Sequence, residues 1–188
     1  MVTTELIRDF VNTRDELDDE EALASPSDLA CWLESNGLAR EGVRATAGDL
    51  VRAIELREAL RQLLLLNTGI EKDEEDRRAA FGVLHDAAAR ARIELCFDAC
   101  AGALEPSAAG VKGALGRLLV GVHAAMADGS WTRLKACRAS DCEWAFIDHA
   151  KNHSRAWCSM RSCGNREKAR SFRERQRAGG EPRKSSSR

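Results

Sequence analysis

Apolar residues recur every three to four positions along most of the first 130 residues, the spacing that places side chains on one face of an α-helix. The longest stripe follows Thr46 and continues through five apolar positions to Asn67-Thr68-Gly69. Thr46 with Asp49 three residues later forms an acidic variant of the capping box, a common helix start. The pattern therefore predicts one long helix from Thr46 to about Asn67.

Shorter stripes predict the other elements of this region. They lie at 5–13, from Pro26 to Asn36-Gly37, from Asp73 onward, and at 107–126, where four glycines weaken helix propensity but allow close helix packing. The charged segment 14–28 is predicted to be a loop. Alternating Ile93, Leu95 and Phe97 ahead of Ala101-Gly102 make a β-hairpin plausible. The expected fold is mainly α with a possible small β-hairpin.

Charge divides the chain near Ser130. Residues 1–130 hold 14 Lys+Arg against 24 Asp+Glu, a net charge of −10, whereas residues 131–188 hold 15 against 6, a net charge of +9. We therefore expect an acidic helical domain at 1–130, a basic module at 131–178 and a disordered basic tail at 179–188. Such asymmetry indicates that the basic part meets nucleic acid, an anionic surface or the acidic domain itself.

Neither a membrane span nor a secretory signal is evident, because the longest apolar runs are too short and the start "MVTTELIRDF" lacks a basic and apolar leader. We expect a cytoplasmic protein without a membrane partner. In a reducing compartment, clustered cysteines favour metal binding or redox chemistry over structural disulfides.

The acidic domain contains no catalytic constellation, and we do not expect an enzyme. Cys31, Cys96 and Cys100 lack basic neighbours that would activate a thiol, and they are interpreted as small buried apolar residues. His85 and His123 have no metal-ligating partner one turn away on their predicted helices.

Two equally spaced cysteine pairs lie in the basic module. Four residues separate Cys137 from Cys142 and Cys158 from Cys163, and fifteen residues lie between the pairs. Four thiolates suit the tetrahedral, soft-ligand preference of Zn²⁺, and four protein ligands leave no position for substrate. The pattern predicts one structural zinc ion. Between the pairs, Trp144 and Phe146 alternate as in a strand and supply apolar packing.

Three other interpretations of these cysteines fit the spacing less well than a zinc site does. A dithiol redox pair usually has the tighter Cys-x-x-Cys spacing, and four unrelated buried cysteines rarely show two matched spacings within 27 residues. Cys137 and Cys142 with His149 and His153 superficially resemble a Cys2His2 finger, but six residues separate the pairs where about twelve are needed. We expect neither histidine to be a ligand.

A basic helix is predicted to begin at Cys163-Gly164-Asn165, with Gly164 letting the backbone approach the metal and Asn165 as N-cap. Phe172 is expected to anchor one face of it to the module. Arginines recur at i, i+4, i+7 and i+11 on a neighbouring face, an arrangement that suits DNA phosphates and guanine edges. The candidate DNA-binding residues are Arg161, Arg166, Lys168, Arg170, Arg173, Arg175 and Arg177. The same stripe is also compatible with a solvated helix paired to its own glutamates, or docked on the acidic domain.

The segment "RLKACRASDCEWAFIDHAKNHSRAWCSMRSCGNREKARSFRERQR" at 133–177 closely resembles the CGNR zinc finger. The resemblance implies that Cys137, Cys142, Cys158 and Cys163 bind zinc and that the module binds DNA. The acidic domain resembles the ABATE domain, described as a stress-induced transcription regulator, through three segments: "DFVNT" at 9–13, "DLACWL" at 28–33 and "LREALRQLL" at 56–64.

These observations together predict a zinc-dependent transcription regulator whose basic helix contacts DNA. Its acidic domain would sense a small-molecule effector, bind a protein or form a homodimer, because one finger with one basic helix offers a small DNA interface. The alternative is a protein-interaction adaptor whose zinc module docks a partner.

Overall fold

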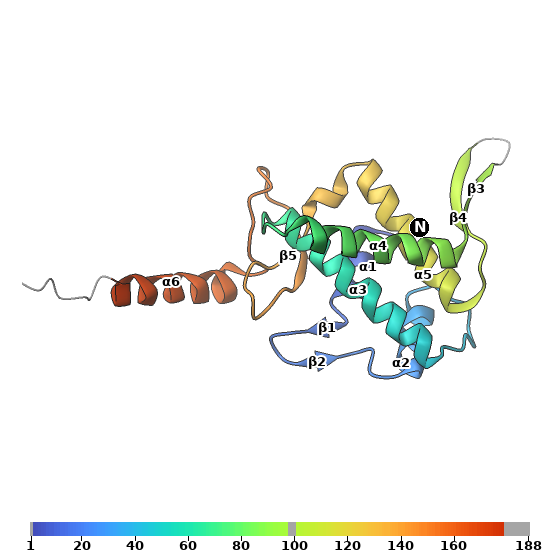
Figure 1. The fold of residues 1–188 in the computed structure, drawn as a ribbon, viewed down its shortest axis with the longest axis horizontal. Helices are drawn as coiled ribbons and strands as arrows, with labels where there is room; N and C mark the ends of the chain where they lie inside the picture. The colour runs from blue at the N-terminus through green and yellow to red at the C-terminus, as the bar shows by residue number, and fades with distance from the viewer. Residues whose placement is uncertain (1, 98–100, 179–188) are drawn as a thin grey trace, which may run out of the picture.

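The computed structural model describes residues 2–97 and 101–178 of the chain. Its helices are α1 (Thr4–Val11), α2 (Pro26–Ser35), α3 (Ala47–Asn67), α4 (Glu74–Ala91), α5 (Gly110–Ala127) and α6 (Asn165–Ala178). Its strands form three antiparallel pairs: β1 (Arg14–Asp15) with β2 (Glu20–Glu21), β3 (Ile93–Phe97) with β4 (Gly102–Pro106), and β5 (Leu134–Ala136) with β6 (Ala145–Ile147). A 3₁₀ turn, η1 (Ser130–Arg133), and a π-turn, η2 (Met160–Gly164), complete the fold. The mainly α-helical class is confirmed (Figure 1).

The long helix α3 lies at the centre of the core, as its apolar stripe predicts. Thr46 and Asp49 form the expected capping box, with the Thr46 hydroxyl accepting from the Asp49 amide and the Asp49 carboxylate accepting from the Thr46 amide. Helices α1, α2, α4 and α5 pack against α3. Leu56, Leu60 and Leu64 are fully buried there, so the helical region closes around one hydrophobic cluster.

Glycines in α5 permit close packing, which confirms their expected role. A Cβ on Gly116 would lie 2.5 Å from the Cβ of Ala91 in α4, and one on Gly121 would lie 2.4 Å from a side-chain carbon of Val2. The helix begins at Gly110 and not at Ser107, because the Ser107 and Ala108 amides donate to carbonyls at the end of α4.

The β3–β4 hairpin is confirmed, with Leu95 opposite Leu104. Strand β4 packs against α5, while the outer part of the hairpin projects from one end of the molecule (Figure 1), and Leu95 and Phe97 are exposed by 59% and 78%. Two expectations were wrong nearby. The charged loop contains the short β1–β2 ladder, and Cys31 and Cys96 are exposed because they lie on outward faces of α2 and β3. Cys100 lies outside the described residues.

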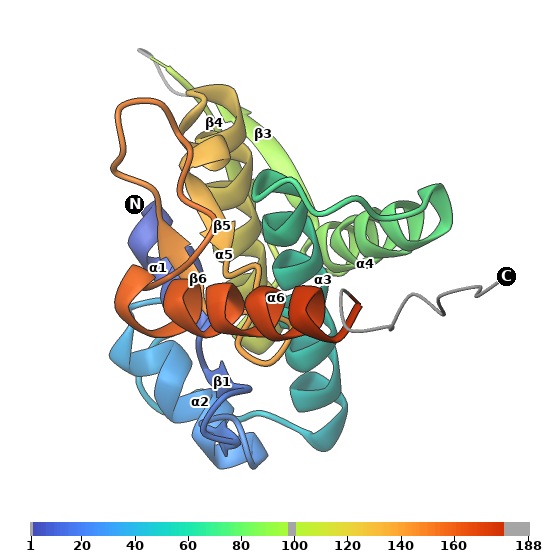
Figure 2. The ribbon, with the colours of Figure 1, turned by 90° about the vertical axis from the view of Figure 1, so that its left-hand side faces the viewer.

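The β5–β6 hairpin joins the basic segment to the helical core. Leu134, Ala136 and Ala145 are fully buried in the same cluster as the leucines of α3. Strand β5 packs against α3, and β6 packs against α1. Beyond this hairpin, α6 projects from the opposite end to β3–β4 (Figure 1), and the view from that side shows it in front of the body (Figure 2). None of the described helices has the length and apolar character required to cross a bilayer.

Candidate metal centre

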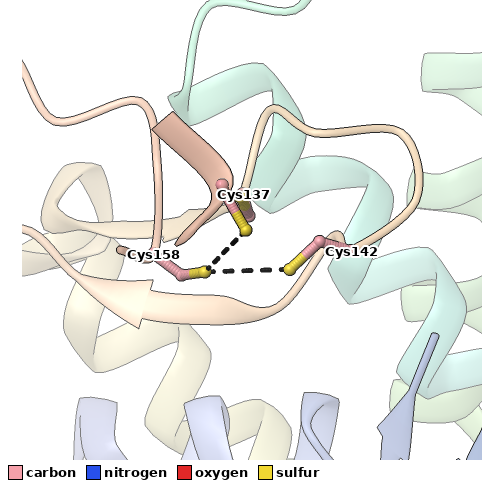
Figure 3. Close-up of side chains that lie close together, drawn as sticks. Cys137, Cys142 and Cys158 are labelled. Carbon is pink, nitrogen blue, oxygen red and sulfur yellow. Dashed lines mark hydrogen bonds between the residues drawn. The ribbon is translucent and has the colours of Figure 1, made fainter. Parts of the chain in front are cut away.

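Four cysteines converge where the β5–β6 hairpin meets η2. The sulfurs of Cys137, Cys142, Cys158 and Cys163 all lie within 4.8 Å of one another. The Cys142–Cys158 and Cys158–Cys163 sulfur distances are 3.7 and 3.6 Å. Figure 3 shows the first three side chains pointing toward a common point. Zinc with bonds of about 2.3 Å at tetrahedral angles requires sulfur separations of about 3.8 Å, so the cluster fits this ion.

Backbone turns place each sulfur. The Cys137 amide donates to the Trp144 carbonyl across the hairpin, and the Cys142 and Glu143 amides donate to the Ala139 carbonyl, closing a tight turn. Glu143 adopts a left-handed conformation there, with φ of 47°. Cys163 lies within η2, whose first turn is capped by the Ser159 hydroxyl. The two cysteine pairs thus sit on two compact turns that face each other.

Apolar side chains enclose the sulfurs. Trp144, Trp157 and Ala139 pack against the cysteines in a small cluster separate from the main core. Cys137, Cys142 and Cys163 are buried, while Cys158 is half-buried. Trp144 therefore provides the packing around the sulfurs that the sequence predicted and Trp157 adds to it, whereas Phe146 is not part of this cluster.

The close approach of the four sulfurs shifts the pKa values of several of these cysteines. Hydrogen bonds from Cys142 and Cys158 hold the pKa of Cys137 far below its ordinary value. The same contact raises the pKa of Cys142, and the hydrogen bond to Cys137 raises that of Cys158 to about 12. A negative charge on Cys137 thus disfavours ionisation of Cys142 and Cys158, and a bound divalent cation favours the thiolate form of such ligands.

A buried ion pair shapes the loop that leads to Cys158. The Lys135 ammonium donates to the Asp148 carboxylate at 2.8 Å and to the carbonyls of His153 and Arg155. Asp148 also accepts from the amides of Ala150 and Arg155, and it is fully buried. The sequence does not indicate this pair, because Lys135 and Asp148 each look like an ordinary polar residue in a short strand or turn.

Arg61, which no sequence pattern singled out, connects the helical body to the turn that carries Cys142. Arg61 is 1% exposed and donates to the Glu143 carbonyl at 3.1 Å and to the Val11 carbonyl at 2.8 Å. Arg57, one turn earlier, is 3% exposed and pairs with Glu21 through both oxygens. Two arginines at i and i+4 on the apolar face of the longest predicted helix were a signal that could have identified them.

Among the described residues the sulfur cluster comprises four cysteines, and His149 and His153 lie outside it. Two expectations about the C-terminal helix were wrong. Asn165 has helical dihedral angles and donates to the Arg161 carbonyl, so Ser159 and not Asn165 caps the helical segment. Phe172 is 57% exposed because α6 projects from the module, so it anchors nothing there.

The basic side chains of α6 fall into two groups. Arg170, Arg173 and Arg175 are exposed and bond within their own helix, the first to Glu167 and the others to backbone carbonyls. Lys168 of α6 is also exposed, as is Arg161 in the preceding η2. Arg166 differs, because its Nη2 lies 3.1 Å from Asp141 Oδ1 and 3.5 Å from Cys163 Sγ. Arg177 lies in α6, but its side chain is outside the described part.

Residues 5–134 match a family model named ABATE, with the description "Putative stress-induced transcription regulator". The chain belongs to the ABATE family. Residues 133–176 of this ABATE protein match the CGNR zinc finger, and its four clustered cysteines support one structural zinc ion. Neither model describes an enzyme family. Comparison with curated proteins gave no match.

Proposed function

We propose that this ABATE protein binds DNA through the exposed arginines of α6 and thereby regulates transcription, and that Cys137, Cys142, Cys158 and Cys163 are the ligands of the zinc ion that holds α6 in place. The observation that supports this most directly is the position of α6, a basic helix that projects from the zinc turn with its cationic side chains in solvent. Fourteen residues give a helix about 21 Å long, and the major groove admits a helix of this width.

Electrostatics favour phosphate as the partner of this surface. The surface comprises Arg161, Lys168, Arg170, Arg173 and Arg175, with Arg177 further along the same helix. Only Arg170 among the described side chains of α6 has a glutamate partner within that helix, at 3.0 Å and near the surface. An exposed pair of this kind contributes roughly 0–1 kcal/mol and is easily exchanged for a phosphate contact.

Salt-dependent binding to a mixed duplex DNA pool tests the proposal. Each arginine that neutralises a phosphate contributes about one unit to the slope of log affinity against log salt. We expect the Arg170→Ala/Arg173→Ala double variant to flatten that slope by about two units. A matched control is Arg77→Ala/Arg78→Ala, which removes the same charge from exposed positions on α4.

Zinc content is measured on every sample, because loss of the finger would mimic loss of contacts. We expect Cys158→Ser to lose both zinc and DNA binding, while Cys31→Ser, which removes an exposed free thiol, keeps both. If the zinc-loaded protein fails to bind DNA even at low salt, the proposal is wrong.

A second candidate function is a protein-interaction adaptor, and the β3–β4 hairpin favours it. Leu95 and Phe97 present apolar surface on an arm that stands clear of the body, which is typical of protein contacts. Under the main proposal this end of the molecule, opposite α6, is where a protein partner or a second copy would meet the regulator.

We further propose that the protein works in the cytoplasm, where its free thiols stay reduced.

A further inference from the structure

In the CGNR tetrad, which comprises Cys163 to Arg166, Gly164 and Asn165 contact η2 and its surroundings, and Arg166 contacts the sulfur cluster. Asn165 donates from its side chain to the Arg161 carbonyl at 3.2 Å and so braces η2, the wide turn that carries Cys163. A Cβ on Gly164 would lie 2.7 Å from the sulfur of Met160 and 3.3 Å from the Trp157 ring, so the glycine leaves space for side chains beside the cluster. These contacts therefore stabilise η2, the turn that carries Cys163.

Arg166 follows the same pattern. Its Nη2 sits between Asp141 Oδ1 at 3.1 Å and Cys163 Sγ at 3.5 Å, a position that links the first cysteine turn to the second. Its Nε is buried and has no hydrogen-bond partner. A buried guanidinium nitrogen is costly unless negative charge lies close by.

Four thiolates with one Zn²⁺ ion have a net charge of −2, and this supplies the negative charge near Arg166. Within the described residues, Arg166 is the cationic side chain with a hydrogen bond to one of the four sulfurs. An N–H donor directed at a thiolate, itself oriented by a carboxylate, is the usual arrangement by which outer groups fix a metal ligand. The exposed arginines of α6 make no such contact, since Arg173 and Arg175 donate to carbonyls of their own helix.

We propose that Arg166 is a positioning residue of the zinc centre and not a DNA contact: its guanidinium bridges Cys163 and Asp141 and offsets the negative charge of the thiolates. This inference rests on the proposed zinc ligands. It divides the arginine stripe of α6 by function, with the first arginine serving the metal and the later ones serving DNA.

Zinc affinity, measured by competition with a chromophoric chelator in the absence of DNA, tests the assignment. Loss of an outer partner of a metal ligand weakens binding by about 10–100-fold, and we expect Arg166→Ala to fall in that range. Arg170→Ala removes an equal charge one turn further along the same helix, and we expect it to stay within about twofold of the parent protein. Equal zinc affinities for Arg166→Ala and the parent protein would overturn the proposal.

Two further measurements protect the test against misfolding of the alanine variant. With saturating Co²⁺, Arg166→Lys is expected to shift the sulfur-to-cobalt charge-transfer band, because an ammonium cannot reproduce the bridge to Cys163 and Asp141; an unshifted band would count against the bridge. With saturating zinc, Arg166→Ala is expected to keep the salt slope of DNA binding. A slope flattened by one unit with unaltered zinc affinity would make Arg166 a phosphate contact. The zinc and cobalt measurements need no DNA. They therefore test the role of Arg166 even if the protein proves not to bind DNA.

Discussion

At the residue scale, one buried carboxylate holds the loop that delivers Cys158. Asp148 accepts from the Lys135 ammonium and from two backbone amides, and neither side chain of the pair is more than 5% exposed. Burial alone would raise the pKa of Asp148, but hydrogen bonds from Lys135, Ala150 and Arg155 outweigh it and lower the pKa below its ordinary value. The carboxylate is therefore stabilised in its charged form by folding.

We predict that Asp148→Asn destabilises the protein by about 3–5 kcal/mol, because the amide leaves the buried Lys135 ammonium without a counter-charge. Thermal unfolding should shift by about 6–20 °C for a chain of this size. Glu74→Gln is the control, because Glu74 pairs with Arg78 in an exposed setting and should cost at most about 1 kcal/mol. Similar melting shifts for the two variants would contradict the prediction.

The pH dependence has a definite sign. A carboxyl whose pKa is lower in the folded state contributes stability above its unfolded pKa and loses it as pH falls through the folded pKa. The parent protein should thus lose the contribution of Asp148 as the solution is acidified below the ordinary range of a carboxyl. In Asp148→Asn, the free energy of unfolding should therefore fall less on acidification than in the parent protein. Denaturant unfolding at several pH values measures this difference.

The same scale shows what local sequence can and cannot predict. The four cysteines were found because each pair is a local spacing and zinc needs just such a set of thiolates. Arg61 was not found, because its acceptor at Glu143 lies 82 positions away and exists only once the hairpin has docked. Lys135 and Asp148 meet only after β5 has paired with β6, so their contact is not visible in the local sequence.

At the scale of elements, α6 differs from the other helices in having almost no packing. Residues 168–176 are all exposed, and the substantial contacts of α6 are with η2 at its start. A solitary helix of about this length is marginal in water. The hydrophobic stripes of α3, α4 and α5 predicted helices that a core stabilises, whereas the stability of α6 must come from its residues' propensities and from its partner.

We predict that the helicity of α6 controls DNA affinity. Ser171 is exposed, and replacing it with alanine or glycine leaves the charge unchanged while altering helix propensity by about 1 kcal/mol between the two variants. Ser171→Ala should bind DNA about fivefold more tightly than Ser171→Gly at the same salt concentration. Far-UV circular dichroism should show more helix in the alanine variant before DNA is added. Equal affinities despite different helicity would mean that α6 is not the element that must be ordered for binding.

At the scale of the whole molecule, the two family modules share a hydrogen-bonded seam. The Asn12 side chain donates to the Ala145 carbonyl and accepts from the Ala145 amide, at 2.9 and 2.8 Å, so it continues the pairing of β6 onto α1. From the end of α3, Asn67 donates to the Leu134 carbonyl and Thr68 to the Ala136 carbonyl. The two family models meet at residues 133–134, and packing and hydrogen bonds cross this point freely.

Asn12 explains part of the "DFVNT" element in physical terms. Asparagine carries one donor and one acceptor at its tip, which is what the two backbone groups of a single residue in an edge strand require. The sequence could not indicate this, because Asn12 and Ala145 are 133 positions apart. Helix periodicity predicted the helices of the body, but it does not reveal the long-range polar contacts to the finger, such as those of Asn12, Asn67 and Arg61.

We predict that this seam makes zinc binding and the stability of the helical body interdependent. Chelation of zinc should lower the melting temperature of the body and speed hydrogen exchange in α1 and at the end of α3, because β5–β6 packs on both. In Asn12→Ala, two buried backbone groups of Ala145 lose their partners, at a cost of about 1–3 kcal/mol each. Chelation should then disturb α1 less than in the parent protein, since the connection is already weakened.

Asn36→Ala provides the control for this experiment, because the Asn36 side chain bonds only to the Trp32 carbonyl of its own helix among the described contacts. It should lose some stability while keeping the full effect of chelation on α1. If exchange in α1 of the parent protein is the same with and without zinc, the finger and the body are energetically independent despite their shared core. If it changes in the parent protein and in Asn36→Ala but not in Asn12→Ala, α1 senses the state of the metal through Asn12, while the contacts of Asn67 and Thr68 connect the finger to α3.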